Sequence, residues 1–221
     1  MKKIIQFGEH VDGYTIPVLN EREIRAAAGI LFLGTFISLV IILSTNNFVP
    51  VKYFITFFLF DLLIRVLINP RYSPTLILGR LIVKNQTPEY VAAKQKKFAW
   101  IIGILLATLM FVFLVLVNAY SIFTGITCLI CLIFLFFESS FGICLGCMVY
   151  PLFYRDKVQY CPGEICDKKS RQAIQKIAVA QVLILFVFIG IIIFTIAVSK
   201  DLYKTPPHNL FRKTNTAAPK R

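Results

Sequence analysis

The sequence predicts an all-α fold: a polytopic membrane bundle of about five transmembrane helices, with a short interfacial helix and a half-helix. Hydrophobic residues make up 57% of the 221 residues, against about 45–50% in soluble domains. They gather in runs of roughly 20 residues, the length at which a helix crosses the bilayer core. Lysines and arginines, which give a net charge of +13, lie between the runs. This distribution indicates cytoplasmic loops beside anionic lipid and argues against nucleic acid as a partner.

The N-terminal part of the chain contains the first two predicted spans. Residues 1–25 form a polar N-terminal arm, in which Asn20 can cap the helix that follows. The core membrane domain covers residues 26–153. Its first two spans are residues 26–44 and 48–68, joined by a short polar turn.

The second span contains Asp61 and Arg65, which lie one helical turn apart and therefore project from one face. Charges inside a membrane are costly and normally face the interior of the bundle. Two interpretations follow: an ion pair that fixes helix packing, or a polar pocket that relays protons or anions. The candidate polar pocket comprises Asp61, Arg65, Arg71 and Ser73.

A break follows the second span. Ser73 and Pro74 suit the N-cap and first position of a new helix. Residues 75–84 are predicted to form an amphipathic helix in the membrane interface, because the segment is too short and too charged to cross. Residues 85–97 then form a basic loop.

The third span covers residues 98–117, with Trp100 expected as an aromatic anchor at the lipid headgroups. The fourth covers residues 120–137. The apolar chain after it is too short for another full pass, so a half-helix at the membrane face is predicted. Gly142 and Gly146 have the spacing that lets helices approach closely.

Three further regions complete the chain: a cysteine-containing loop at residues 154–176, an additional transmembrane helix at 177–198 and a disordered basic tail at 199–221. Basic residues are frequent in the arm and in the loops after the second and fourth spans, but scarce in the two short turns. The N-terminus and the cysteine loop are therefore predicted to be cytoplasmic. The tail, which also carries six basic residues, conflicts with this orientation.

All six cysteines lie between Cys128 and Cys166. Cys128 and Cys131 are in mid-span and are predicted to be core residues, because a buried cysteine behaves as a small hydrophobe. Cys144 and Cys147 have a spacing at which both sulfurs face one way, close enough for a disulfide after a small adjustment.

The candidate catalytic site combines Cys144, Cys147 and Glu138. A nearby arginine lowers the pKa of a thiol and burial in lipid raises it; Arg65 and Arg71 are the candidate cations. Glu138 could accept a proton or pair with an arginine. Redox or sulfur-carrier chemistry, metal binding and simple packing all remain open for the cysteine pair.

Cys161 and Cys166 form a second pair, in the loop. Four thiolates from the two pairs could hold zinc, as structural zinc sites do. Equally, the loop dithiol could exchange electrons with the membrane dithiol. We assign no metal ligands, and the thiol chemistry requires no cofactor, although quinone and zinc both fit the sequence.

Five blocks carry a resemblance. They are Leu19-Asn-Glu-Arg-Glu-Ile-Arg25, Asp61-x-x-x-Arg65, Arg71-Tyr-Ser-Pro74, Lys97-Phe-Ala-Trp100-x-x-Gly103 and Glu138-Ser-x-Phe-Gly-x-Cys144-Leu-Gly-Cys147-x-x-Tyr150. In order and spacing, over about residues 18–150, they resemble a bacterial integral-membrane family catalogued as domain of unknown function 4395. The resemblance implies a compact bundle and a link to thioredoxin-like or sulfurtransferase partners. The shared polar residues that it implies are Asn20, Arg25, Asp61, Arg65, Arg71, Ser73, Glu138, Cys144 and Cys147.

The leading hypothesis is an integral membrane protein that handles thiols or reduced sulfur, by relay or transport, through the membrane-edge cysteine pair. One alternative is a quinone-linked thiol–disulfide oxidoreductase. Another is a non-catalytic subunit or scaffold of a larger membrane complex. The hypotheses differ in whether the protein is an enzyme, and the sequence leaves that choice open.

Overall fold

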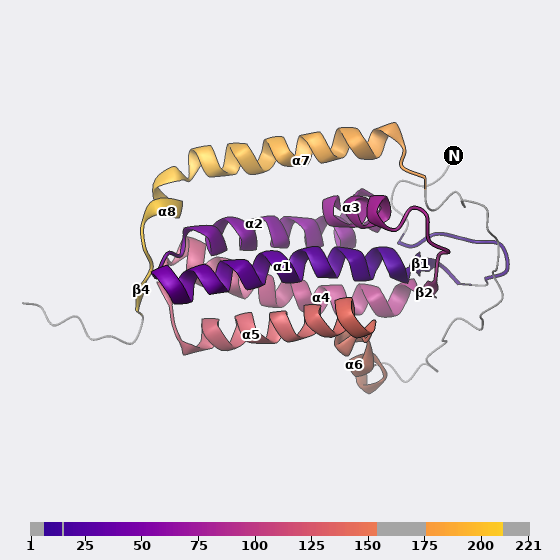
Figure 1. Ribbon diagram of the computed structural model, residues 1–221, viewed down its shortest axis with the longest axis horizontal. Helices are drawn as coiled ribbons and strands as arrows, with labels where there is room; N and C mark the ends of the chain where they lie inside the picture. Colours follow the sequence, from indigo (N-terminus) through magenta and orange to yellow (C-terminus); the bar gives the residue numbers. More distant parts are fainter. Residues whose placement is uncertain (1–6, 15, 154–175, 210–221) are drawn as a thin grey trace, which may run out of the picture.

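The computed structural model describes residues 7–14, 16–153 and 176–209, and in these residues the chain is a bundle of long helices (Figure 1). Four helical runs are long and apolar enough to cross a membrane. They are α1 (Glu21–Thr45), α4 (Ala93–Phe111) with a π-helical turn (Val112–Leu116), α5 (Ile122–Phe136) with a π-helical turn (Phe137–Phe141), and α7 (Val179–Val198). The predicted all-α membrane fold is confirmed, and the chain is a multi-pass membrane protein.

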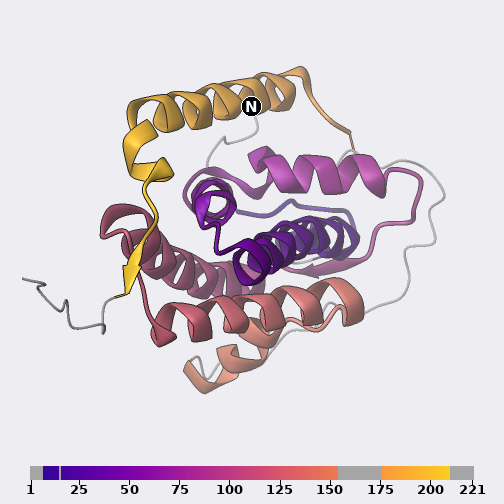
Figure 2. The ribbon, with the colours of Figure 1, turned by 60° about the vertical axis from the view of Figure 1, so that its left-hand side comes forward.

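Helix α2 (Val49–Leu63) continues into a π-helical turn (Ile64–Ile68) and runs beside α1 in the opposite direction (Figures 1 and 2). It carries Lys52, Asp61 and Arg65, whose side chains are all buried. These charges face protein rather than lipid, as expected for charged residues within a membrane span. Helix α2 and its π-helical turn correspond in position to the second predicted span, residues 48–68. The described residues therefore contain the five long helices expected.

Local sequence signals set the helix boundaries. Asn20 caps α1, since its side chain accepts a hydrogen bond from the amide of Arg22 (3.2 Å). Ser73 caps α3 (Pro74–Ile82), whose first residue is a proline, as predicted. Gly142 ends the π-helical turn after α5 with a φ of 69°, a left-handed conformation that glycine adopts without strain.

Helix α3 packs with its polar face inward. Thr75, Gly79 and Arg80 are buried, whereas Leu81 and Ile82 are exposed by 47% and 62%. A Cβ atom at Gly79 would lie 2.6 Å from the backbone oxygen of a residue in α1, so glycine permits this close contact. The first half of the helix is thus buried, including Leu76 and Ile77, and its polar residues find partners inside the protein.

Helix α6 (Leu145–Phe153) is the predicted half-helix, and it lies across the end of α4 and α5 (Figures 1 and 2). Its contact with α4 depends on Gly146, where an added Cβ would lie 2.8 Å from the Cβ and 3.0 Å from the Cα of Ala99. Gly142 and Gly146 therefore have different roles: the first makes a turn and the second allows close packing.

Replacing Gly146 with alanine is expected to destabilise the protein by about 1–3 kcal/mol, because the contact is with backbone that cannot move aside cheaply. Thermal unfolding in detergent would measure the loss. The matched control is Gly125→Ala in α5, where an added Cβ meets nothing within 4 Å. That variant should be neutral or slightly more stable, and equal effects at the two glycines would contradict the assigned packing role.

Short strands hold the ends of the chain against the bundle. In the N-terminal arm, β1 (Val18–Asn20) pairs antiparallel with β2 (Tyr90–Ala92). Near the C-terminus, β4 (His208–Asn209) pairs parallel with β3 (Ala119–Tyr120). Helix α8 (Lys200–Lys204) precedes β4. The disorder predicted from residue 199 therefore does not apply to residues 200–209, and the rest of the tail lies outside the described residues.

A buried lysine explains why this part of the tail is ordered. Lys52 is 0% exposed, and its Nζ donates to Oδ1 of Asn118 (2.6 Å) and to the backbone oxygens of Leu202 (3.2 Å) and Thr205 (2.6 Å). A buried ammonium is costly unless it is fully hydrogen-bonded. Its C-terminal acceptors lie 150 and 153 residues further along the chain, so no local signal in the sequence points to this contact.

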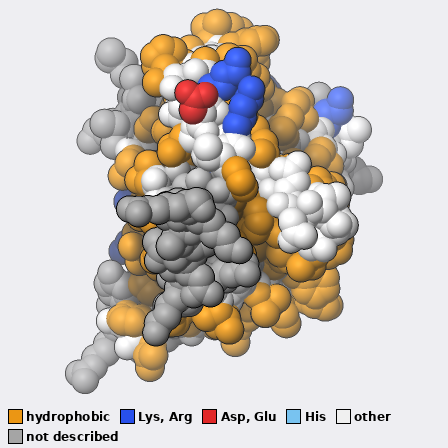
Figure 3. Space-filling model, turned by 90° about the vertical axis from the view of Figure 1, so that its left-hand side faces the viewer, with side chains coloured by type: hydrophobic (Ala, Val, Ile, Leu, Met, Phe, Trp, Pro, Cys, Tyr) orange, Lys and Arg blue, Asp and Glu red, His pale blue; other side chains and the backbone are white. Residues whose placement is uncertain are grey.

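The bundle has two unlike ends. The end that carries the arm, β2 and α6, here called the cysteine end, contains most of the described basic residues: Arg22, Arg25, Arg71, Arg80, Lys84, Lys94, Lys96 and Lys97. Residues 46–48, β3 and α8 form the opposite end, where Figure 3 shows hydrophobic side chains, uncharged polar atoms and a few charged side chains. The described part of the tail lies at this second end, as a five-span bundle requires.

Candidate functional site

Cys144 and Cys147 are joined by a disulfide, with their Cα atoms 5.1 Å apart. Cys144 directly precedes α6, and its backbone oxygen accepts bonds from the amides of Cys147 (3.0 Å) and Met148 (3.1 Å). Its Sγ accepts a bond from the same Cys147 amide, at 3.2 Å. Cys144 is therefore the N-cap of α6. A helix N-terminus stabilises a thiolate, so Cys144 is the better leaving group of the pair.

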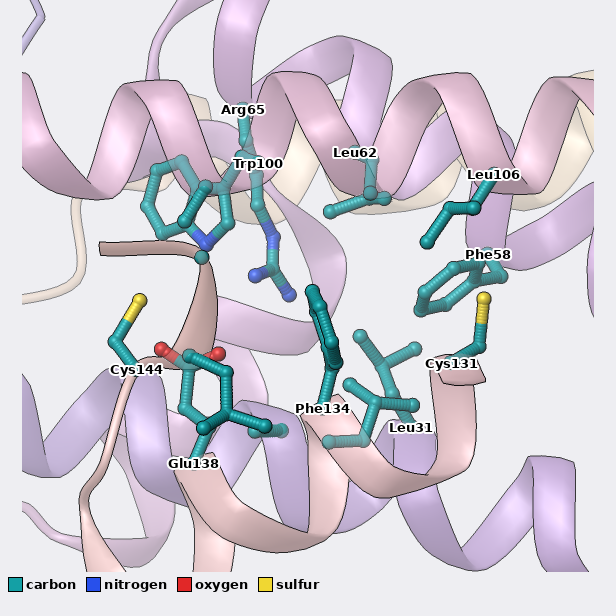
Figure 4. A pocket seen from close by; sticks show the side chains of 16 residues that line it. Leu31, Phe58, Leu62, Arg65, Trp100, Leu106, Cys131, Phe134, Glu138 and Cys144 are labelled. Carbon is teal, nitrogen blue, oxygen red and sulfur yellow. The ribbon is translucent and has the colours of Figure 1, made fainter. Parts of the chain in front are cut away.

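The disulfide borders a cavity of about 50 Å³ among α1, α2, α4, α5 and the start of α6 (Figure 4). Such a volume holds a few water molecules or a ligand of similar size. At one end of the cavity lie Cys144, Arg65, Trp100 and Glu138. The other end is apolar and is lined by residues that include Leu31, Phe58, Leu106 and Cys131.

Asp61 and Arg65 form a buried ion pair, with 2.8 Å between Nη2 and Oδ2. The carboxylate of Asp61 also accepts bonds from the hydroxyl of Ser73 (2.8 Å) and from the amide and hydroxyl of Thr75 (3.0 and 2.7 Å). The Arg65 side chain donates to both of these hydroxyls in turn. Three of the four residues of the predicted polar pocket are thus in mutual contact, and they tie α2 to the start of α3.

Arg71 is not part of this cluster. Its Nε lies 3.8 Å from Oε1 of Glu9 in the N-terminal arm. Its backbone oxygen accepts a bond from Nε2 of Gln181 (2.8 Å), a fully buried residue of α7. Arg71 therefore connects the arm and α7 to the break after α2, and the cation that lines the Cys144 cavity is Arg65.

Glu138 pairs with a lysine. Lys96 donates through Nζ to Oε1 of Glu138 (2.8 Å) and to Oε1 of Glu21 (3.1 Å), and the Glu21 Oε2 is 2.9 Å away. All three side chains are largely buried, at 5%, 14% and 10% relative exposure. The sequence analysis did not include Lys96 or Glu21 in the site. They are 42 and 117 residues from Glu138, so no local spacing points to them.

Trp100 is a core residue, and the expectation of a headgroup anchor was wrong. Its side chain is 4% exposed. The guanidinium of Arg65 lies over the indole, 5.1 Å from the ring centroid, and Phe7 packs edge-on at 5.7 Å. The flat arginine and the folded-back arm cover the ring, and neither contact could be inferred from the apolar pattern of the span.

Cys128 and Cys131 are free, buried thiols in α5, as the core prediction required. We expect both to react with N-ethylmaleimide far more slowly in folded protein than Cys144 and Cys147 after reduction, because their burial keeps the reagent away from the sulfur. Mass spectrometry of peptides after timed labelling would check this. Equal rates for Cys131 and Cys144 would show that the apolar end of the cavity admits reagents.

Comparison with known proteins places the chain in a family. A family model described as a domain of unknown function, DUF4395, matches residues 19–155. The chain belongs to this family. The resemblance seen over residues 18–150 is therefore confirmed. A search of curated proteins and a search of solved structures found no match.

The DUF4395 region contains all the residues that line the Cys144 cavity, whereas α7 and α8 lie beyond it. The predicted loop dithiol, Cys161 and Cys166, falls outside the described residues. Within the residues that are described, no group of three or more His, Cys, Asp or Glu side chains is placed to hold a metal ion.

Proposed function

We propose that this protein is a thiol–disulfide relay of the bacterial inner membrane, in which Cys144 and Cys147 exchange two electrons with thioredoxin-like partners at the cytoplasmic face. One observation carries the proposal: a disulfide at the N-terminus of α6 borders a cavity that also contains Arg65 and Glu138. A merely structural disulfide needs neither a helix N-terminus nor a charged cavity beside it.

This exchange needs no oxidant other than the Cys144–Cys147 disulfide itself. A thiolate of a reduced partner attacks Sγ of Cys147, and the Sγ of Cys144 leaves as a thiolate stabilised by the amide at the start of α6. The second thiol of the partner, once deprotonated, attacks the partner's own sulfur atom that is bonded to Cys147. This attack expels Cys147 as a thiolate. The partner leaves as a disulfide. The reverse sequence passes the two electrons to another disulfide, and Glu138 serves as proton acceptor for Cys144.

The test uses the purified protein in detergent, with Cys161 and Cys166 changed to serine so that only one dithiol responds. Reduction with dithiothreitol should add two maleimide-reactive thiols, and an oxidised thioredoxin-like protein should remove them. A Cys144→Ser variant should accumulate a mixed disulfide through Cys147, because the resolving thiol is missing. Cys128→Ser is the matched control and should behave as the parent. Inertness of the disulfide towards dithiols would overturn the proposal.

The excess of basic residues at the cysteine end supports a cytoplasmic location for the disulfide. A membrane-impermeant maleimide should therefore label reduced Cys147 in inverted membrane vesicles and not in spheroplasts. Labelling in spheroplasts alone would place the cysteine end outside the cell and would contradict the proposed orientation.

A further inference from the structure

The cavity beside Cys144 contains a hydrogen-bond donor without a partner. Nε1 of Trp100 is buried and donates to no acceptor in the described part of the chain. In Figure 4 this nitrogen lies on the edge of the indole that faces Arg65, Cys144 and Glu138. A buried N–H group that forms no hydrogen bond costs about 1–3 kcal/mol. Its position therefore indicates that a small hydrogen-bond acceptor occupies this end of the cavity.

We propose that the acceptor is hydrosulfide and that it converts the disulfide into a persulfide on Cys144. This inference rests on the proposed function, since it uses the same disulfide. The cavity, about 50 Å³ in volume, has room for a ligand of one to about three non-hydrogen atoms, and hydrosulfide has one. It has no room for a protein thiol, which would have to approach Cys147 from outside; Cys147 is not among the cavity-lining residues.

The charges in the cavity fit a ligand that enters neutral and reacts as an anion. Each charged group already has a counterion, Asp61 for Arg65 and Lys96 for Glu138. Neutral hydrogen sulfide can therefore enter without a large electrostatic barrier. The Trp100 N–H and the Arg65 guanidinium favour its deprotonated form, and Glu138 can take the proton.

The step balances in atoms and electrons. Hydrogen sulfide gives a proton to Glu138, and the sulfur of the resulting hydrosulfide attacks Sγ of Cys144. The bond between the two cysteine sulfurs breaks, and the electron pair leaves on Cys147, which takes up the proton. The products are a persulfide on Cys144 and a free thiol on Cys147. Cys147 is the poorer leaving group, and the confinement of the nucleophile against Cys144 offsets this disadvantage.

The first experiment treats the oxidised full-length protein, in detergent, with sodium sulfide. Alkylation and peptide mass spectrometry should find one extra sulfur atom on Cys144 and a free thiol on Cys147. The extra sulfur on Cys147 instead would overturn the assignment of the cavity. Reduction by dithiothreitol in parallel separates the two proposals. If dithiothreitol reduces the pair and sulfide gives no persulfide, this inference fails and the relay stands; if neither reacts, both fail.

A variant pair then tests the role of the donor. Trp100→Phe keeps an aromatic ring and removes the N–H group. It should lower the ratio of the sulfide rate to the dithiothreitol rate about tenfold, as expected for one lost hydrogen bond to a charged group. Tyr53→Phe removes a hydroxyl from a ring at the opposite end of the bundle, where it stacks on Tyr203 at 4.8 Å, and should leave the ratio unchanged. An unchanged ratio in Trp100→Phe would contradict the proposal.

The unmodified protein offers a measurement that does not depend on the folding of a variant. Trp100 is the only tryptophan in the chain, so its fluorescence reports directly on the cavity. Sodium azide, an anion that does not reduce the disulfide, should change this fluorescence in a saturable manner. Sodium chloride at the same ionic strength controls for screening. A strictly linear response to azide, or none, would mean that the cavity holds only water and would overturn the inference.

Discussion

Replacing Asp61 with alanine is expected to lower the free energy of unfolding by about 3–5 kcal/mol, the range measured when one partner of a buried ion pair is removed. Arg65, whose side chain is 3% exposed, would lose its counterion. Ser73 and Thr75 would lose the acceptor that joins the start of α3 to α2. Titration with SDS in mixed micelles, followed by tryptophan fluorescence, would measure the loss.

A second ion pair in the chain provides the control. Arg22 and Glu89 lie 2.6 Å apart, but their side chains are 34% and 49% exposed, and such pairs contribute about 0–1 kcal/mol. Glu89→Ala should therefore have a small effect. A double variant, Asp61→Leu with Arg65→Met, should recover much of the stability lost in Asp61→Ala, because apolar residues of similar size often replace a buried pair without cost. If Asp61→Ala is no worse than Glu89→Ala, the cluster does not hold α2 and α3 together.

The Asp61 cluster was predictable because its signals are local. The four-residue spacing to Arg65 put both charges on one face, and the Ser73-Pro74 pair marked a helix start. The same local reasoning placed the half-helix that begins after Cys144 and the buried positions of Cys128 and Cys131. Each of these depends on residue spacing, on capping or on the length of an apolar run, and all three are properties of a short stretch of chain.

The rest of the site depends on contacts between distant segments. Lys96 was assigned to a basic loop, yet α4 begins at Ala93 and carries the lysine into the protein, where carboxylates of α1 and α5 meet it. Trp100 was assigned to the membrane interface because tryptophans are common there. In the structure, Arg65 and Phe7 cover the indole ring of Trp100. Similarly, residues 75–84 were predicted only as an amphipathic interfacial helix, and the partners of Thr75 and Arg80 lie in α2 and α1.

Replacing Lys96 with alanine is the variant that tests the second buried cluster, and we expect a loss of about 3–5 kcal/mol. The lysine is the cation shared by Glu21 and Glu138. Without it, two largely buried carboxylates would face each other, and at least one would have to take up a proton or turn towards water. Either response costs free energy, so the loss should exceed that of an ordinary surface lysine.

Lys94 is the matched control, since it is exposed and lies in the same first turn of α4. Lys94→Ala should change stability by no more than about 0.5 kcal/mol. Adding Glu138→Gln to Lys96→Ala should recover part of the loss, because one of the two uncompensated charges is then gone. Glu138 lines the cavity beside Cys144, so Lys96→Ala should also change the rate at which dithiothreitol reduces the disulfide. A variant that is stable and reacts normally would show that Lys96 neither holds the bundle together nor positions Glu138 beside Cys144.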